Sequence, residues 1–102
     1  MSIIKLNENN FSIARESTSP VLIDFYADWC GPCRMVAPVV EQIAEERADV
    51  IVGKVNVDES PALAAEFGVY SIPTLVVMKG GRVVRREVGA KPKGVILSMI
   101  EG

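Results

Sequence analysis

Both cysteines of this chain lie in the stretch Trp29-Cys30-Gly31-Pro32-Cys33. Two thiols at this spacing can help to bind a metal ion, form a structural disulfide, or exchange disulfides with another molecule. Closed zinc and iron–sulfur sites usually take four ligands. The chain has no histidine and no third cysteine, so a metal site would need carboxylates or a second subunit. Because a disulfide across so short a loop adds little stability, the residues favour redox exchange.

The spacing of Cys30 and Cys33 suits redox chemistry if a helix begins between them. Their side chains would then lie about 5–6 Å apart, within the range that a disulfide tolerates. Only the thiolate attacks a disulfide, and a free cysteine with a pKa of about 8.5 is mostly protonated at neutral pH. The positive end of a helix dipole can lower that pKa by roughly one unit. We expect Cys30 to be exposed at the helix start and Cys33 to lie one turn inside.

Two apolar runs rich in β-branched residues predict buried strands, and one charged residue interrupts each run. Residues 21–27 contain Asp24, and residues 50–57 contain Lys54. An aspartate in an apolar strand is costly unless it is paired or neutral, and a raised pKa would suit a proton acceptor and donor. The alternative for Asp24 is an acid at a strand end that reaches solvent.

The other elements follow from apolar periodicity and from turn residues. Apolar residues at helical spacing predict a helix over residues 31–46, and Gly80-Gly81 predicts a hairpin turn. Further expected elements are strands at 3–6, 74–78 and 82–88 and helices at 7–16, 61–67 and 92–101. This order predicts an α/β fold, in which a mixed central sheet of about five strands is flanked by about four helices. We expect a single domain over residues 1–102.

Composition and charge exclude several classes of protein. The 102 residues include 11 basic and 13 acidic side chains, interspersed along the chain, for a net charge of −2. This gives no electrostatic footprint for nucleic acid. No stretch reaches the roughly 18 apolar residues of a membrane span, and the N-terminal residues lack the features of a signal peptide. We therefore expect a cytoplasmic protein, in a compartment that keeps structural thiols reduced.

Several further motifs accompany the cysteine pair. The chain reads DFYADWC into the first cysteine and APVVEQIAEE in the following helix, then KVNVDESP, IPTLVVMKGG and VGA. Together with WCGPC, these motifs stand in the order and at the spacing of the thioredoxin family, which the chain resembles over nearly its whole length. The resemblance implies the thioredoxin fold.

The resemblance also implies a thiol–disulfide oxidoreductase that reduces disulfides in target proteins. Cys30 would be the nucleophile, and Cys33 the resolving cysteine that releases the reduced target. No bound cofactor or metal is implied, because the cysteine pair itself carries the electrons, which come from NADPH or another donor through a thioredoxin reductase. The implied partners are that reductase and disulfide-containing target proteins, and we expect a monomer.

Two residues outside the motif gain implied roles. Asp24 matches the family's buried acid, which assists deprotonation of the resolving cysteine. Lys54 matches the family's lysine near that acid, where it would temper the acid's pKa. The alternative for Lys54 is an edge lysine whose stem lies along apolar surface.

A substrate-binding surface is implied in the same way. Pro73 matches the family's cis-proline, which faces the cysteine pair and leaves the backbone of Ile72 free to pair with an extended substrate. The implied docking residues are Trp29, Gly31, Pro32, Ile72, Pro73, Gly89 and Ala90. The alternative for Trp29 is a core aromatic.

The chain departs from the family's common residues at a few positions. Arg34 stands where lysine is common, and Tyr26 where tryptophan is common. Tyr70 and Ser71 stand where basic residues or glycine are frequent, which affects the choice of partners.

Two competing functions stay open at the level of sequence. An oxidase or isomerase would use the same chemistry, although proline beside glycine between the cysteines resembles the reducing members of the family. A binding module would dock partners on its apolar surface regardless of the redox state of the cysteines.

Overall fold

The computed structural model describes residues 3–102, and its elements follow the expected order. They are β1 (Ile4–Lys5), α1 (Ser12–Arg15), β2 (Val21–Tyr26), α2 (Gly31–Glu46), β3 (Ile51–Asn56), α3 (Pro61–Glu66), β4 (Thr74–Lys79), β5 (Arg82–Val88) and α4 (Lys93–Glu101). The predicted α/β class is thus confirmed, with five strands and four helices in the described part of the chain.

The five strands form one mixed sheet in the order β1-β3-β2-β4-β5. β3 is parallel to both β1 and β2, whereas β4 is antiparallel to β2 and to β5. β2 is therefore the central strand, and its residues from Val21 to Phe25 are buried. Burial on both faces explains why this strand reads as a continuous apolar run in the sequence.

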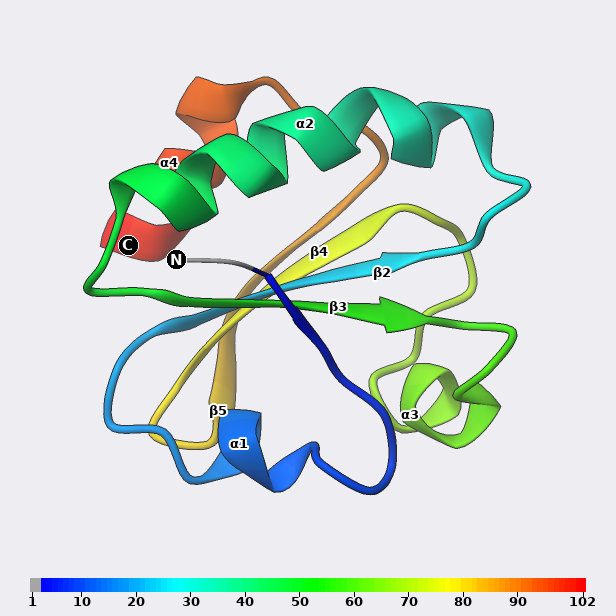
Figure 1. Cartoon of the computed structure of the whole chain (residues 1–102), viewed down its shortest axis with the longest axis horizontal. Coiled ribbons are helices and arrows are strands. Elements are labelled where there is room, and N and C mark those ends of the chain that lie inside the picture. The colour runs from blue at the N-terminus through cyan, green and yellow to red at the C-terminus, as the bar shows by residue number, and fades with distance from the viewer. Residues whose placement is uncertain (1–2) are drawn as a thin grey trace.

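Helices cover both faces of the sheet. Figure 1 shows α2 and α4 on one face and α1 and α3 on the other. Successive residues of β2 point to opposite faces, so Leu22 packs in the core under α2 and α4, whereas Ile23 and Phe25 pack in the core on the other side. The same alternation places Asp24 on the α2 face of the sheet.

The hairpin between β4 and β5 has the predicted glycine turn. Gly80 and Gly81 have φ angles of 60° and 78°, in the left-handed region where glycine has no steric penalty. Such a turn matches the twist of paired antiparallel strands. The strands pair from Thr74 with Val88 to Lys79 with Arg82, with one register shift between Val77 and Met78.

The helix expected at residues 7–16 is much shorter in the structure, where α1 has only four residues. The Asn10 side chain accepts the N–H of Asn7 at 2.7 Å, and the Asn7 side chain accepts the N–H of Asn9 at 2.8 Å. These local bonds compete with helical hydrogen bonds. Because asparagine makes such bonds readily, it is favoured in turns and caps over helix interiors. Ile13, which lies within the range of the expected helix, is 40% exposed.

Candidate functional site

The cysteine pair lies at the start of α2, as the sequence predicts. Cys30 is the N-cap of the helix, and its sulfur accepts the backbone N–H of Cys33 at 3.2 Å. Pro32 occupies an early helical position, where its missing N–H costs no hydrogen bond. The two Cα atoms lie 5.3 Å apart, and the sulfurs form a disulfide. The structure therefore represents the oxidised form of the pair.

Both cysteines are buried in this form. Cys30 is 4% exposed and Cys33 is 3% exposed, so the expectation of an exposed Cys30 is wrong for the disulfide. The pair packs with Ala27 against Tyr26 and Ile72, which are partly buried. The Cys30 sulfur lies 3.8 Å from the Ile72 carbonyl oxygen. The exposed fractions of the two cysteines are therefore alike, and any difference in their roles must come from the residues around each sulfur.

The loop before β4 lies beside Cys30. The Ile72–Pro73 peptide bond is cis, as the resemblance implied. The carbonyl of Pro73 accepts the N–H of Gly89 at 2.7 Å, and the Ser71 carbonyl accepts the Thr74 hydroxyl at 2.6 Å. The first of these bonds brings the glycine after β5, and with it the exposed Ala90, next to the proline.

Trp29 is on the surface and is held there by an acid. Its side chain is 67% exposed, which excludes the alternative of a core aromatic. The indole Nε1–H donates to Asp58 Oδ2 at 2.8 Å. Sequence reasoning missed Asp58, because it lies 29 residues further along the chain and no spacing rule connects the two. Gly31 and Pro32, which follow Trp29 closely in the sequence, are also exposed.

Asp24 is a buried acid, and its Oδ1 has no hydrogen-bond partner among residues 3–102. The residue is 4% exposed, so the alternative of a strand-end acid that reaches solvent is wrong. Its Oδ1 is buried, and no group of the described residues donates a hydrogen bond to it. Burial raises the pKa of Asp24 to about 7, although the charge of Lys54 acts to lower it. The carboxyl group can therefore gain or lose a proton near neutral pH.

Lys54 lies opposite Asp24 in the register of β2 and β3. β3 lies between β1 and β2, so the alternative of an edge lysine is wrong. The ammonium group stands 5.6 Å from the centroid of the Tyr26 ring. Among the ion pairs of residues 3–102, none joins Lys54 to Asp24, so the lysine acts on the carboxyl group from a distance.

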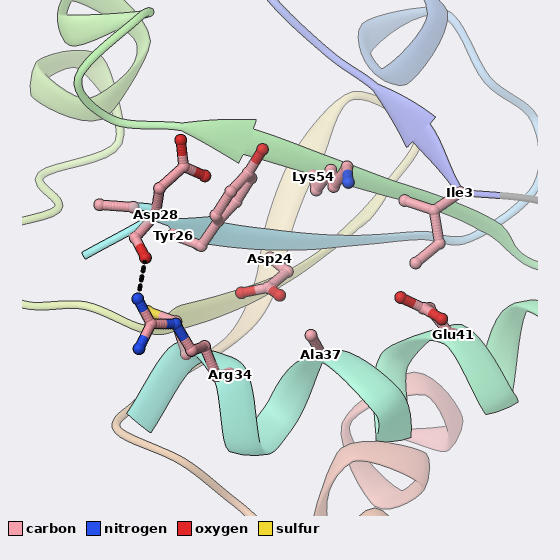
Figure 2. A pocket seen from close by; sticks show the side chains of 10 residues that line it. Ile3, Asp24, Tyr26, Asp28, Arg34, Ala37, Glu41 and Lys54 are labelled. Carbon is pink, nitrogen blue, oxygen red and sulfur yellow. Dashed lines mark hydrogen bonds between the residues drawn. The ribbon is translucent and has the colours of Figure 1, made fainter. Parts of the chain in front are cut away.

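A pocket of about 180 Å³ opens beside this carboxyl group, between the sheet and α2. Figure 2 shows the Asp24 side chain pointing toward α2, with Ala37 across from it and Lys54 on the neighbouring strand. The pocket is lined by Ile3, Asp24, Tyr26, Ala27, Asp28, Cys33, Arg34, Ala37, Glu41 and Lys54. Of the two cysteines, Cys33 lines the pocket together with Asp24. The sequence predicted Asp24 and Lys54 here but missed the lining residues Ile3, Ala37 and Glu41.

Two other features bear on the class of protein. Within the described residues, no three carboxylates or cysteines lie close enough together to hold a metal ion. None of the helices in this part of the chain is long and apolar enough to cross a membrane.

Comparison with known proteins gives a consistent family. The model of the family described as Thioredoxin matches residues 2–102. A thioredoxin of Alicyclobacillus acidocaldarius is 54% identical over 89 residues, which cover 86% of this chain and 85% of that protein. A thioredoxin of Streptomyces clavuligerus is 54% identical over 82 residues, covering 80% of this chain and 77% of the relative. The chloroplastic M-type thioredoxin of Chlamydomonas reinhardtii is 48% identical over 98 residues, which cover 94% of this chain and 70% of that protein.

Proposed function

Because this chain belongs to the thioredoxin family and is a thiol–disulfide oxidoreductase with Cys30 and Cys33 as its redox pair, we propose separate roles for the two sulfurs. Cys30 attacks the disulfide of a target protein, and Cys33 resolves the mixed disulfide. The observation that carries this assignment is the difference between their neighbours. Cys30 caps α2 beside Ile72 in the loop before β4, whereas Cys33 lines the pocket with Asp24.

The attack step needs a thiolate at Cys30. In the reduced protein, the Cys33 N–H and the positive end of α2 stabilise negative charge on this sulfur, because the N-cap position faces the free N–H groups of the helix. The thiolate attacks one sulfur of the target disulfide, a mixed disulfide forms, and the other target sulfur leaves as a thiolate.

The resolution step needs a proton acceptor for Cys33. Asp24 lines the same pocket, and its pKa of about 7 suits a group that takes a proton at neutral pH. Cys33 gives its proton to the Asp24 carboxylate and attacks the Cys30 sulfur. The second target sulfur leaves and takes up a proton from the surroundings. Two electrons have then passed to the target, and the Cys30–Cys33 disulfide is restored.

Lys54 helps Asp24 to be ionised and thus able to accept a proton. Desolvation acts to keep Asp24 protonated, and the lysine charge acts in the opposite direction. The Tyr26 ring beside the ammonium holds the lysine on the side of the sheet that Asp24 shares. In this proposal, Lys54 and Tyr26 are positioning residues that act through Asp24.

The docking surface consists of Trp29, Gly31, Pro32, Ile72, Pro73, Gly89 and Ala90. It is supported by the exposed indole, by the contact of Cys30 with Ile72, and by the hydrogen bond that joins Gly89 to Pro73. Pro73 has no N–H, so the adjoining backbone of Ile72 can pair with an extended segment of the target. Tyr70 is exposed two residues before Ile72 in the sequence, and in this proposal it contributes to the choice of target.

The family has a reductase and target proteins as partners and needs no bound cofactor beyond the redox-active pair. For this chain we propose a thioredoxin reductase that draws on NADPH or another donor, and target proteins with accessible disulfides. We further propose a monomeric, cytoplasmic protein with a single domain over residues 1–102. A cytoplasmic location fits a pair that must be returned to the dithiol state after each cycle.

A trapping experiment tests the assignment of the cysteines. A Cys33→Ser variant should accumulate a mixed disulfide with a target that has an accessible disulfide, such as insulin, because the resolving thiol is missing. Non-reducing gels and mass spectrometry would identify the bond at Cys30. The matched Cys30→Ser variant should trap at least about tenfold less, since Cys33 lies inside the pocket. Equal trapping by both variants, or function that survives replacement of both cysteines, would contradict the proposal.

A further inference from the structure

The pocket beside Asp24 has a volume and an apolar part of its lining that the redox reaction does not require. Its volume of about 180 Å³ exceeds that of cavities of about 150 Å³ that bind a benzene molecule. Its walls include the side chains of Ile3, Ala27 and Ala37 and the Tyr26 ring. The volume therefore has room for a single-ring body, which would remove the apolar part of the lining from water.

One polar group in the pocket lacks a partner. Asp24 is 96% buried as a residue, being 4% exposed, and no described group donates to its Oδ1. Oδ1 itself is closed to solvent, but Asp24 lines the pocket, so a ligand donor meets the carboxyl group through its other oxygen and stabilises the charge that burial disfavours. Figure 2 shows this carboxyl group directed into the space in front of Ala37.

The charges around the pocket favour a cationic donor. Three carboxyl groups line it, on Asp24, Asp28 and Glu41, against the cations of Arg34 and Lys54. Arg34 keeps its charge, but it donates to the Asp28 backbone carbonyl at 2.8 Å, as the dashed line in Figure 2 shows, so the backbone already holds one of its N–H groups. Lys54 lies over the Tyr26 ring instead of pairing with Asp24.

We propose that this pocket is a binding site for small organic cations in which an amidinium or guanidinium group is attached to one flat apolar ring. The planar group places an N–H donor on the Asp24 carboxylate from the pocket side, as a charge-assisted hydrogen bond. The ring lies between Ile3 and Ala37, and Glu41 adds negative charge at the rim. Such a site does not depend on the roles proposed for the cysteines, because it is present in the oxidised protein.

The affinity should depend on pH through Asp24. The carboxylate pairs with the cation, whereas the protonated acid does not, and the pKa of Asp24 is about 7. Its ionised share rises roughly tenfold between pH 6 and pH 8, so the affinity should rise by about the same factor. The other charged or titratable groups that line the pocket are Tyr26, Asp28, Arg34, Glu41 and Lys54.

The test is a titration of the oxidised protein with benzamidine, followed by NMR of backbone amides and of the Asp24 carboxyl carbon. Shifts should be confined to the pocket residues, with affinity about tenfold higher at pH 8 than at pH 6. Asp24→Asn should remove this pH dependence and weaken binding at pH 8 by about tenfold or more. Neutral benzamide should bind without pH dependence.

Two further variants separate this site from binding elsewhere on the protein. Ala37→Leu should block binding by filling the pocket, whereas Glu45→Gln changes an exposed acid of α2 outside the pocket and should leave the affinity unchanged. Benzamidine shifts outside the pocket, unchanged binding by Ala37→Leu, or equal affinity at the two pH values would overturn the proposal. Because no step of the titration uses activity, its failure leaves the proposed roles of the cysteines unaffected.

Discussion

Asp24 stands directly opposite Lys54 across the parallel pairing of β2 and β3, yet the two side chains do not form an ion pair. Burial raises the pKa of the acid, and the lysine only partly offsets this effect. The pair thus leaves the carboxyl group able to titrate near neutral pH, beside the cysteine that must lose a proton.

Asp24 should make the protein less stable as the pH rises. Its pKa is raised from 3.8 to about 7. Between these values the unfolded chain has lost the proton that the folded protein retains, so the free energy of unfolding falls by about 4 kcal/mol, at about 1.4 kcal/mol for each pKa unit. Asp24→Asn should lack this slope and be about 1–3 kcal/mol more stable at pH 8, since its amide also lacks partners.

Urea unfolding of the oxidised protein at pH 5 and pH 8 measures the larger part of this difference, about 3 kcal/mol, because the rest of the fall occurs below pH 5. Glu45→Gln, which removes an exposed acid of the same charge, serves as the control and should keep the slope of the parent protein. A parent protein with the same stability at both pH values would show that Asp24 titrates normally.

Removal of the lysine charge should shift the titration of Asp24 upward. In Lys54→Met, the attraction that favours the carboxylate is lost, and the pKa of Asp24 should rise by about one unit. An NMR titration of the Asp24 carboxyl carbon measures the shift directly. Lys5→Met is the matched control. Lys5, on β1, is the register partner of Lys54, on β3, but its ammonium group pairs with Glu59 on the surface. A pKa that stays the same in Lys54→Met would refute the tempering role.

The hydrogen bond from Trp29 to Asp58 should hold the indole in place for docking. Asp58→Ala removes the acceptor at 2.8 Å, and kcat/KM for protein disulfides should fall about two- to fivefold, as for loss of an exposed hydrogen bond. Reduction of a small disulfide reagent should change little. Because the chain has 1 tryptophan, its fluorescence anisotropy reports the motion of this ring.

The neighbouring acid provides the comparison for Asp58. Glu59→Gln changes a charge one residue away that pairs with Lys5 and leaves the indole bond intact. Equal losses in the two variants would mean that the loop charge matters and the hydrogen bond does not.

The two turn glycines should differ in their tolerance of a side chain. Both have positive φ angles, but a Cβ at Gly81 would lie 2.8 Å from the Arg15 carbonyl oxygen, whereas a Cβ at Gly80 would meet open space. Gly80→Ala should cost about 1 kcal/mol for its backbone conformation, and Gly81→Ala at least about 2 kcal/mol. Denaturant midpoints of the two variants test this order, and a reversed order would contradict it.

The local periodicity of the sequence predicted most of the elements. The bounds of α2 agree with the expected helix at 31–46, and the glycine turn identified the β4–β5 hairpin. The prediction was wrong where side chains compete with the backbone, as at Asn7 and Asn10, because a helical pattern of apolar residues does not register such bonds. It was also wrong about Cys30, whose burial depends on Ala27 and Ile72 packing around it.

The sequence by itself determined the chemistry available to this protein, because two cysteines, a helix start and an acid within an apolar strand are all local features. Only the tertiary structure decided which of these groups meet. The parallel register sets Lys54 opposite Asp24, the packing of α2 on the sheet encloses a pocket shared by Asp24 and Cys33, and the loop bond brings Gly89 to Pro73. Distances between residues far apart in the chain arise from packing of whole elements, and no local pattern encodes them.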